Sequence, residues 1–190
     1  GFSSVMFDGS TLEYEENIRQ TREVVKMCHA VGVSVEAELG AVGGDEGGAL
    51  YGHADESLFT DPMLARDFVD RTGIDALAVA IGNAHGKYKG EPLLDFPRLD
   101  AIRQQAAIPL VLHGGSGISD DDFKRAIELG IHKINFYTGM SQAALSAVET
   151  RMANRQPLYD EFAELLLGIE EAITDTVSEQ MRIFGSAGRV

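Results

Sequence analysis

Short apolar runs alternate with longer amphipathic stretches through the first 135 residues of the chain. The runs predict strands because each is too short for a helix, and they cover residues 1–8, 33–39, 76–81, 108–112 and 132–135. The stretches between them carry apolar residues at helical spacing and predict helices over residues 14–31, 60–71, 96–105 and 120–129. Residues 141–184 are predicted to be helical, apart from a break near Pro157.

This repeated βα pattern predicts an α/β fold, with a parallel sheet and helices outside it. Polar residues follow all five strands: Asp8, Glu36 with Glu38, His85, His113 and Asn135. A (β/α)8 TIM barrel keeps its site at the ends of many strands, whereas a doubly wound sheet uses one switch point.

We therefore expect residues 1–190 to form a single domain, the C-terminal two-thirds of a TIM barrel plus C-terminal helices. A barrel has eight βα units, and the chain covers about five, the C-terminal ones. Because the sequence opens at Gly1 directly into a predicted strand, we expect its natural start to lie upstream, with three further βα units.

The composition narrows the class of partner. A formal net charge of −14 and no basic run argue against nucleic acid, and no apolar segment reaches membrane-spanning length. Cys28 is the only cysteine, which excludes an intrachain disulfide and favours a reducing compartment. The expectation is a cytoplasmic protein that binds neither nucleic acid nor membrane.

Two histidines are the strongest chemical candidates. His85 and His113 each follow an apolar strand and precede glycine, and two imidazoles on neighbouring strands suit zinc better than calcium or magnesium. The Gly-Gly-Ser-Gly turn after His113 precedes a helix and can hold a phosphate. Glu36 and Glu38 share one strand face, which would be costly in an ordinary core but suits a polar interior or a metal.

Five motifs occur in order along nearly the whole chain: Ser-Val-Met-Phe-Asp-Gly-Ser, Val-Glu-Ala-Glu-Leu-Gly with Gly-Gly-Asp-Glu, Ala-Ile-Gly-Asn-Ala-His-Gly, Leu-His-Gly-Gly-Ser-Gly and Lys-Ile-Asn. In these motifs the chain resembles the class II, zinc-dependent ketose-bisphosphate aldolases, the family of fructose- and tagatose-bisphosphate aldolases. The resemblance weakens after Asn135.

The resemblance implies metal and proton-transfer roles. His85 and His113 match two zinc ligands; the family's third lies in an Asp-His pair on an earlier strand, and these 190 residues contain no such pair. Asp8 and Glu38 resemble residues around a second cation position. Glu46, in the glycine-rich loop of residues 41–59, matches a glutamate of a mobile loop that takes part in proton transfer.

The resemblance also implies a substrate site, cofactors and partners. The groups that would hold dihydroxyacetone phosphate are Gly86, Gly114, Ser116, Asn135 and Thr138. The implied cofactors are Zn2+ and a monovalent cation, Na+ or K+, near the Gly86 and Gly114 loops. Family members are homodimers or homotetramers that act on a small sugar phosphate.

The expected activity is reversible retro-aldol cleavage of a ketose 1,6-bisphosphate, of tagatose or fructose, to dihydroxyacetone phosphate and an aldehyde such as glyceraldehyde 3-phosphate. Tyr137 stands where many fructose-type members have an aspartate, which leaves the sugar open. A Schiff-base mechanism is disfavoured, because Lys133 lies early in its strand. Two alternatives stay open: a metal-independent phosphate-binding barrel isomerase, and a non-catalytic or fragmentary sugar-phosphate-binding barrel.

Overall fold

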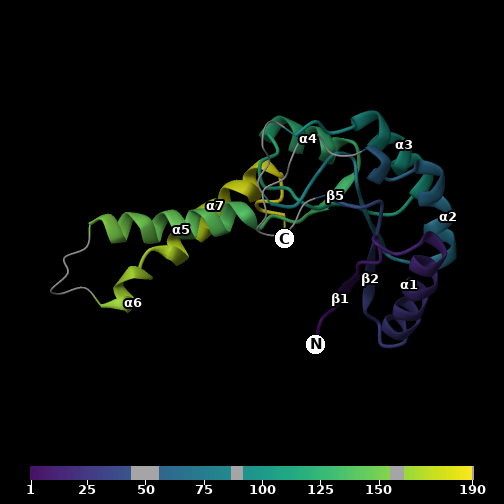
Figure 1. Cartoon of the computed structure of the whole chain (residues 1–190), viewed down its shortest axis with the longest axis horizontal. Helices are drawn as coiled ribbons and strands as arrows, with labels where there is room; N and C mark the ends of the chain where they lie inside the picture. The colour runs from purple at the N-terminus through teal and green to yellow at the C-terminus, as the bar shows by residue number, and fades with distance from the viewer. Residues whose placement is uncertain (44–55, 87–91, 155–160, 190) are drawn as a thin grey trace. The chain divides into compact units, whose positions relative to one another are not determined.

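The computed structural model describes residues 1–43, 56–86, 92–154 and 161–189, which fall into two compact units, residues 1–135 and 136–190. The first unit is built on a five-stranded parallel sheet whose strands follow their order in the chain, β1-β2-β3-β4-β5 (Figure 1). The strands are β1 (Ser4–Phe7), β2 (Ser34–Leu39), β3 (Ala76–Val79), β4 (Leu110–Leu112) and β5 (Ile131–Ile134). All five predicted strands are confirmed.

Four helices follow the first four strands and lie along the outer side of the sheet (Figure 1). They are α1 (Tyr14–His29), α2 (Pro62–Thr72), α3 (Phe96–Ala106) and α4 (Asp120–Glu128), with a short 3-10 turn, η1 (Glu56–Leu58), before α2. Side chains define three of the helix starts, because Asp61, Asp95 and Ser119 each accept a backbone N–H of the first turn. The α/β prediction is therefore confirmed.

The two faces of the sheet differ in chemistry because side chains alternate along each strand. On β2, Val35, Ala37 and Leu39 are buried on the apolar face, while Glu36 and Glu38 lie on the opposite one. The strand register places these glutamates beside Ala76 and Ala78 of β3. The apolar face forms the core with fully buried helix residues such as Phe68, Leu99 and Ile102.

The third strand ends at Val79, two residues before the predicted end at Ile81. Beyond Val79, side chains form hydrogen bonds with the backbone groups. Thr60 is fully buried; its hydroxyl donates to the Leu39 carbonyl and accepts from the Ala80 N–H at 2.9 Å. The Asn83 side chain accepts from the Ile81 N–H at 2.8 Å. The strand ends at Val79 because the next two backbone N–H groups, of Ala80 and Ile81, donate to side chains.

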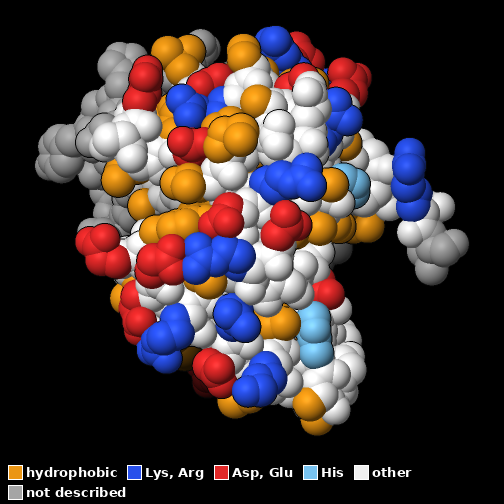
Figure 2. Space-filling model, turned by 90° about the vertical axis from the view of Figure 1, so that its right-hand side faces the viewer, with side chains coloured by type: hydrophobic (Ala, Val, Ile, Leu, Met, Phe, Trp, Pro, Cys, Tyr) orange, Lys and Arg blue, Asp and Glu red, His pale blue; other side chains and the backbone are white. Residues whose placement is uncertain are grey.

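The outer helices carry intermixed acidic, basic and apolar side chains (Figure 2). Arg71 of α2 pairs with Glu15 of α1 at 2.5 Å and with Asp67 at 3.1 Å, and the Tyr14 hydroxyl donates to Asp67 at 2.9 Å. These exposed pairs link α1 to α2, although exposed ion pairs contribute little stability each.

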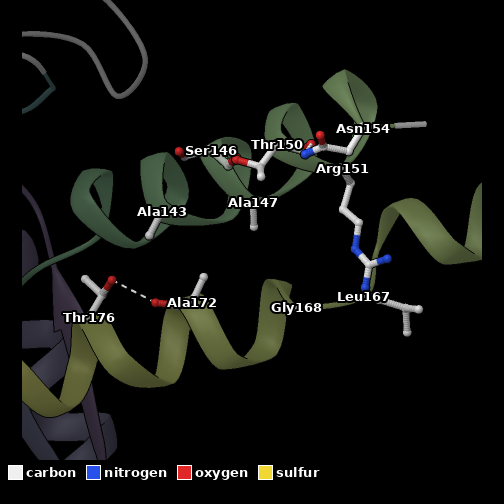
Figure 3. Close-up of a pocket in the computed structure, with 10 residues that line it drawn as sticks. All are labelled: Ala143, Ser146, Ala147, Thr150, Arg151, Asn154, Leu167, Gly168, Ala172 and Thr176. Atoms are coloured by element: carbon white, nitrogen blue, oxygen red, sulfur yellow. Dashed lines mark hydrogen bonds between the residues drawn. The ribbon is translucent and has the colours of Figure 1, made fainter.

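The second unit contains α5 (Thr138–Ala153), α6 (Phe162–Leu165) and α7 (Ile169–Ile183). An open groove between α5 and α7 is lined partly by small residues such as Ala143, Ala147 and Ala172, and Arg151 extends from α5 toward the start of α7 (Figure 3). No residue of these three helices is fully buried in the described chain. The division into two units leaves the expected single domain over residues 1–190 a prediction.

Among the described residues, no helix has both the length and the apolar character needed to cross a bilayer.

Replacing Thr60 by valine tests the link between the ends of β2 and β3. The change keeps the shape but leaves the buried Leu39 carbonyl and Ala80 N–H without the hydroxyl, so we expect the free energy of unfolding to fall by about 1–3 kcal/mol. Thr72→Val is the control, since the Thr72 hydroxyl only adds a bond to a carbonyl within α2 and should cost under about 1 kcal/mol. Equal losses in urea denaturation would contradict this role for Thr60.

Candidate functional site

His113 lies between two glutamates on the polar face of the sheet. Its Nε2 is 3.0 Å from Glu36 Oε1 and its Nδ1 is 2.9 Å from Glu38 Oε2. Each of these three side chains is at most 5% exposed. Glu36 Oε2 also accepts a hydrogen bond from Lys133 Nζ at 2.8 Å. The arrangement is a row of alternating basic and acidic groups that is buried except at Lys133, whose side chain is half-exposed.

Small residues on β3 make this arrangement sterically accessible. Adjacent strands lie about 4.8 Å apart, so β2 and β4 are separated by about 10 Å with β3 between them. The β3 residues next to the glutamates are Ala76 and Ala78, and Ala78 is fully buried. Because alanine stops at Cβ, Glu38 from β2 and His113 from the end of β4 can meet over β3.

The charges within the row stabilise each other. Burial by itself lowers the pKa of His113, but the hydrogen bond with Glu36 and the charges of Glu36 and Glu38 outweigh burial and raise that pKa to about 9. Burial by itself raises the pKa of Glu36, but His113 and Lys133 together hold it below its usual range. In the metal-free protein at neutral pH, His113 is therefore an imidazolium beside the ionised carboxylate of Glu36.

The second histidine lies beside the first. The ring centroids of His85 and His113 are 5.8 Å apart, with the rings tilted by 30°. The His85 N–H donates to the Gly43 carbonyl at 2.8 Å, next to a bridge between Gly43 and Ala84, which fixes the backbone after β3. The amide of Asn83 donates to the His113 carbonyl at 3.1 Å and so ties the segment after β3 to the end of β4.

The turn after His113 packs tightly against the segment that carries His85. Gly114 has a φ of +65°, and a Cβ there would lie 2.1 Å from the Ala84 carbonyl oxygen. Only glycine fits, for both the backbone conformation and the space. The Gly115 N–H donates to the Asn135 carbonyl at 3.2 Å, so β5 also supports this turn.

The chemistry of the described residues fits a zinc ion. Two imidazoles and a carboxylate are ligands that zinc accepts. Glu38 Oε2 is buried, and within the described part of the chain it accepts no aligned hydrogen bond, although it lies 2.9 Å from His113 Nδ1. The contact with His113 is therefore one of charge rather than a well-directed hydrogen bond. No group of three or more His, Cys, Asp or Glu arranged for a metal occurs among the described residues.

The structure brings only some of the predicted site residues together. His85, His113 and Glu38 cluster, Gly86 and Gly114 lie in the adjoining turns, and Ser116 follows them in the turn before α4.

The other predicted residues have different surroundings. Asp8 is exposed, and its carboxylate accepts from the Ser10 N–H at 2.9 Å. The Asn135 carbonyl accepts from the Gly115 N–H in the turn after His113, and Asn135 itself is exposed. Thr138 begins α5 in the second unit, and Glu46 lies outside the described residues. The roles predicted for all these residues stay predictions.

Sequence reasoning missed two members of the cluster. The sequence suggests only a disfavoured Schiff-base role for Lys133, whereas the structure pairs this lysine with Glu36. In the sequence Asn83 is one residue of a motif, and in the structure its side chain joins the segments that carry the two histidines. The signal for Asn83 was its place two residues before His85, at the end of an apolar strand.

Comparison with known proteins supplies the family. The family model described as fructose-bisphosphate aldolase class-II matches residues 1–189. The chain belongs to this family. The resemblance read from the five motifs is confirmed, and the (β/α)8 assignment agrees with the TIM barrels of this aldolase family.

Individual relatives agree with the family match. The uncharacterized protein YdjI of Escherichia coli K12 is 46% identical over 190 residues, which are 100% of this chain and 65% of YdjI. The fructose-bisphosphate aldolase of Geobacillus stearothermophilus is 47% identical over 189 residues, 100% of this chain and 64% of that protein. This aldolase chain thus spans a little under two-thirds of the length of these relatives.

Solved structures show the same fold. The crystal structure of the YdjI aldolase from Escherichia coli K12 has a TM-score of 0.83 at 43% identity and covers 100% of this chain and 63% of that one. The fructose-bisphosphate aldolase of Campylobacter jejuni has a TM-score of 0.76 at 27% identity, covering 97% of this chain and 61% of that one.

The raised pKa of His113 predicts a pH-dependent stability of the metal-free aldolase chain. A group whose pKa rises on folding contributes stability that is complete below its unfolded pKa and is lost as pH rises through the folded value. The loss should therefore run from about pH 6.5 to the folded pKa of about 9, and the shift corresponds to about 3 kcal/mol. Urea denaturation across this range should show the loss in the wild type but not in His113→Gln. Parallel pH profiles would contradict the predicted role of His113.

Enlarging Ala78 should separate Glu38 from His113. Ala78→Leu fills the space over β3, so we expect overpacking to cost about 1–3 kcal/mol and the His113-dependent pH profile to flatten. Ala78→Gly keeps the space open, should cost about 1 kcal/mol and should retain the profile. The same measurement of stability against pH decides between these outcomes, and an unchanged profile in Ala78→Leu would count against steric control by β3.

Proposed function

We propose that the whole protein is a metal-dependent lyase that reversibly cleaves a ketose 1,6-bisphosphate, of tagatose or fructose, to dihydroxyacetone phosphate and an aldehyde such as glyceraldehyde 3-phosphate. The observation that carries the proposal is the pair of imidazoles, His85 and His113, whose ring centroids lie 5.8 Å apart beside the buried carboxylate of Glu38. Membership of the class II fructose-bisphosphate aldolase family supports the reaction class.

In this proposal His85 and His113 hold Zn2+, and Glu38 and Asp8 serve a second cation position. Bound zinc supplies a Lewis acid that polarises the substrate carbonyl. The buried carboxylates support binding because they favour a cation in a region with little water. His113 must give up a proton to become a neutral ligand, so zinc affinity should rise with pH.

The remaining groups would bind substrate and move protons. Gly86, Gly114, Ser116, Asn135 and Thr138 are proposed to hold dihydroxyacetone phosphate, with a monovalent cation, Na+ or K+, near the glycine turns. The position of the turn before the N-terminus of α4 supports phosphate binding there, because a helix start favours an anion. Glu46 is proposed to transfer a proton.

The proposal extends to the setting of the enzyme. We infer a cytoplasmic homodimer or homotetramer whose partner is the sugar phosphate rather than nucleic acid or membrane. The acidic balance of the chain, a formal net charge of −14, supports the exclusion of nucleic acid.

Cleavage of fructose and tagatose 1,6-bisphosphates by the full-length protein tests the function. We expect activity that a chelator abolishes and Zn2+ restores. His85→Ala and His113→Ala should each lower kcat/KM by more than about 100-fold, since even second-shell partners of metal ligands contribute about 10- to 100-fold.

His132→Gln is the matched control and should leave the rate unchanged, because His132 is exposed and its ring forms a hydrogen bond with the Gly130 carbonyl, away from the two histidines of the site. The ratio of the two substrate rates identifies the sugar. Cleavage that resists the chelator would overturn the zinc assignment, and absence of cleavage with both sugars would overturn the proposed substrate class.

A further inference from the structure

A lysine and a glutamate form a chain of hydrogen bonds that ends on His113. Lys133 Nζ donates to Glu36 Oε2 at 2.8 Å, and Glu36 Oε1 lies 3.0 Å from His113 Nε2. The Glu36 side chain is 5% exposed and uses both oxygens, one for each partner. Lys133 is half-exposed, so its ammonium reaches the buried carboxylate from a solvated side chain.

This chain is a product of tertiary structure. Glu36 comes from β2, His113 follows β4 and Lys133 belongs to β5, which are separated in sequence by 77 and 97 residues from Glu36. A buried carboxylate is costly unless it is paired and hydrogen-bonded. Lys133 and His113 together meet that requirement, so loss of either should leave Glu36 poorly compensated.

The pairing determines which nitrogen of His113 is held by the protein. An ionised carboxylate only accepts hydrogen bonds, so Glu36 requires a proton on Nε2. The opposite nitrogen, Nδ1, faces Glu38 Oε2 at 2.9 Å, and no described residue donates an aligned hydrogen bond to this oxygen. Nδ1 and Glu38 Oε2 are therefore the two adjacent atoms with capacity for another ligand.

We propose that Lys133 and Glu36 are positioning residues that hold the Nε2–H of His113 and thereby present Nδ1, beside Glu38, to a divalent metal ion. The inference rests on the proposed function, since it requires that His113 bind a metal. It assigns Lys133 of β5 a role in positioning a metal ligand. Histidine ligands commonly donate their second N–H to a carboxylate, which fixes the ring and its tautomer.

Lys133 acts through Glu36 in this proposal, and substitutions separate the two contributions. Lys133→Met removes the ammonium and leaves the carboxylate with His113 alone. Glu36→Gln leaves one acceptor oxygen in place of two, so Lys133 and the Nε2–H of His113 can no longer each have an oxygen of their own. Lys133→Arg keeps a positive donor on a half-exposed side chain and is the conservative rescue.

Metal binding by the full-length protein, stripped of metal, provides the test. We expect Lys133→Met and Glu36→Gln to weaken Zn2+ binding by about 10- to 100-fold and to alter the visible absorption bands of bound Co2+, which report coordination geometry. Lys133→Arg should stay within about 3-fold of the wild type.

Lys124→Met is the control, since Lys124 of α4 is exposed and pairs with Asp121 at 3.4 Å, and it should change neither the affinity nor the Co2+ spectrum. A purely structural role for Lys133 would lower stability but leave the spectrum of bound Co2+ unchanged. That result, or wild-type affinities in Lys133→Met and Glu36→Gln, would overturn this inference while the proposed function stands.

A measurement on the wild type covers the case in which these variants fold poorly. Nitrogen-15 chemical shifts of the zinc-loaded protein should show His113 with a proton on Nε2 and the metal on Nδ1. Metal on Nε2 would overturn the inference even if cleavage is zinc-dependent. A wild type that binds neither Zn2+ nor Co2+ would overturn the proposed function together with the inference.

Discussion

The electrostatic pairing of His113 with the two glutamates is the interaction on which the polar face of this sheet depends. Carboxylates on the inner side of a strand are unfavourable unless a cation compensates them. Glu36 and Glu38 are both nearly inaccessible to water, and His113 lies within 3.0 Å of each. The alanines of β3 follow from this requirement, because a larger side chain would separate the partners.

The fold was largely predictable because it depends on local patterns. Apolar runs and helical spacing located all five strands and the helices between them. Strand ends were less predictable, since at Ala80 and Ile81 the hydrogen bonds come from Thr60 and Asn83, which a pattern of polarity does not reveal. The second unit was predicted as one helical region broken near Pro157, and it contains α5, α6 and α7.

The two histidines of the site were predictable because they belong to motifs at strand ends. The position of Lys133 was not predictable, because it depends on the register between β4 and β5. His85 and His113 end apolar strands, so their proximity follows from parallel neighbours. Lys133 could not be assigned to a face, because an irregularity between Leu110 and Val111 shifts the register and pairs Val111 with Lys133. A regular ladder would have placed His132 there instead. One skipped residue therefore decides which side chain of β5 reaches Glu36.

The distribution of this cluster over the chain has a consequence for the order of folding. His113 meets Glu36 across 77 residues of sequence, and Lys133 meets the same carboxylate across 97. Contacts of such separation are slow to form, because loop closure must precede them. A partly folded chain with β2, β3 and β4 assembled would contain both histidines but no ammonium beside Glu36. The complete charge pattern around His113 arises only when β5 joins the sheet, so a nascent chain cannot assemble it before residue 133 has been synthesised.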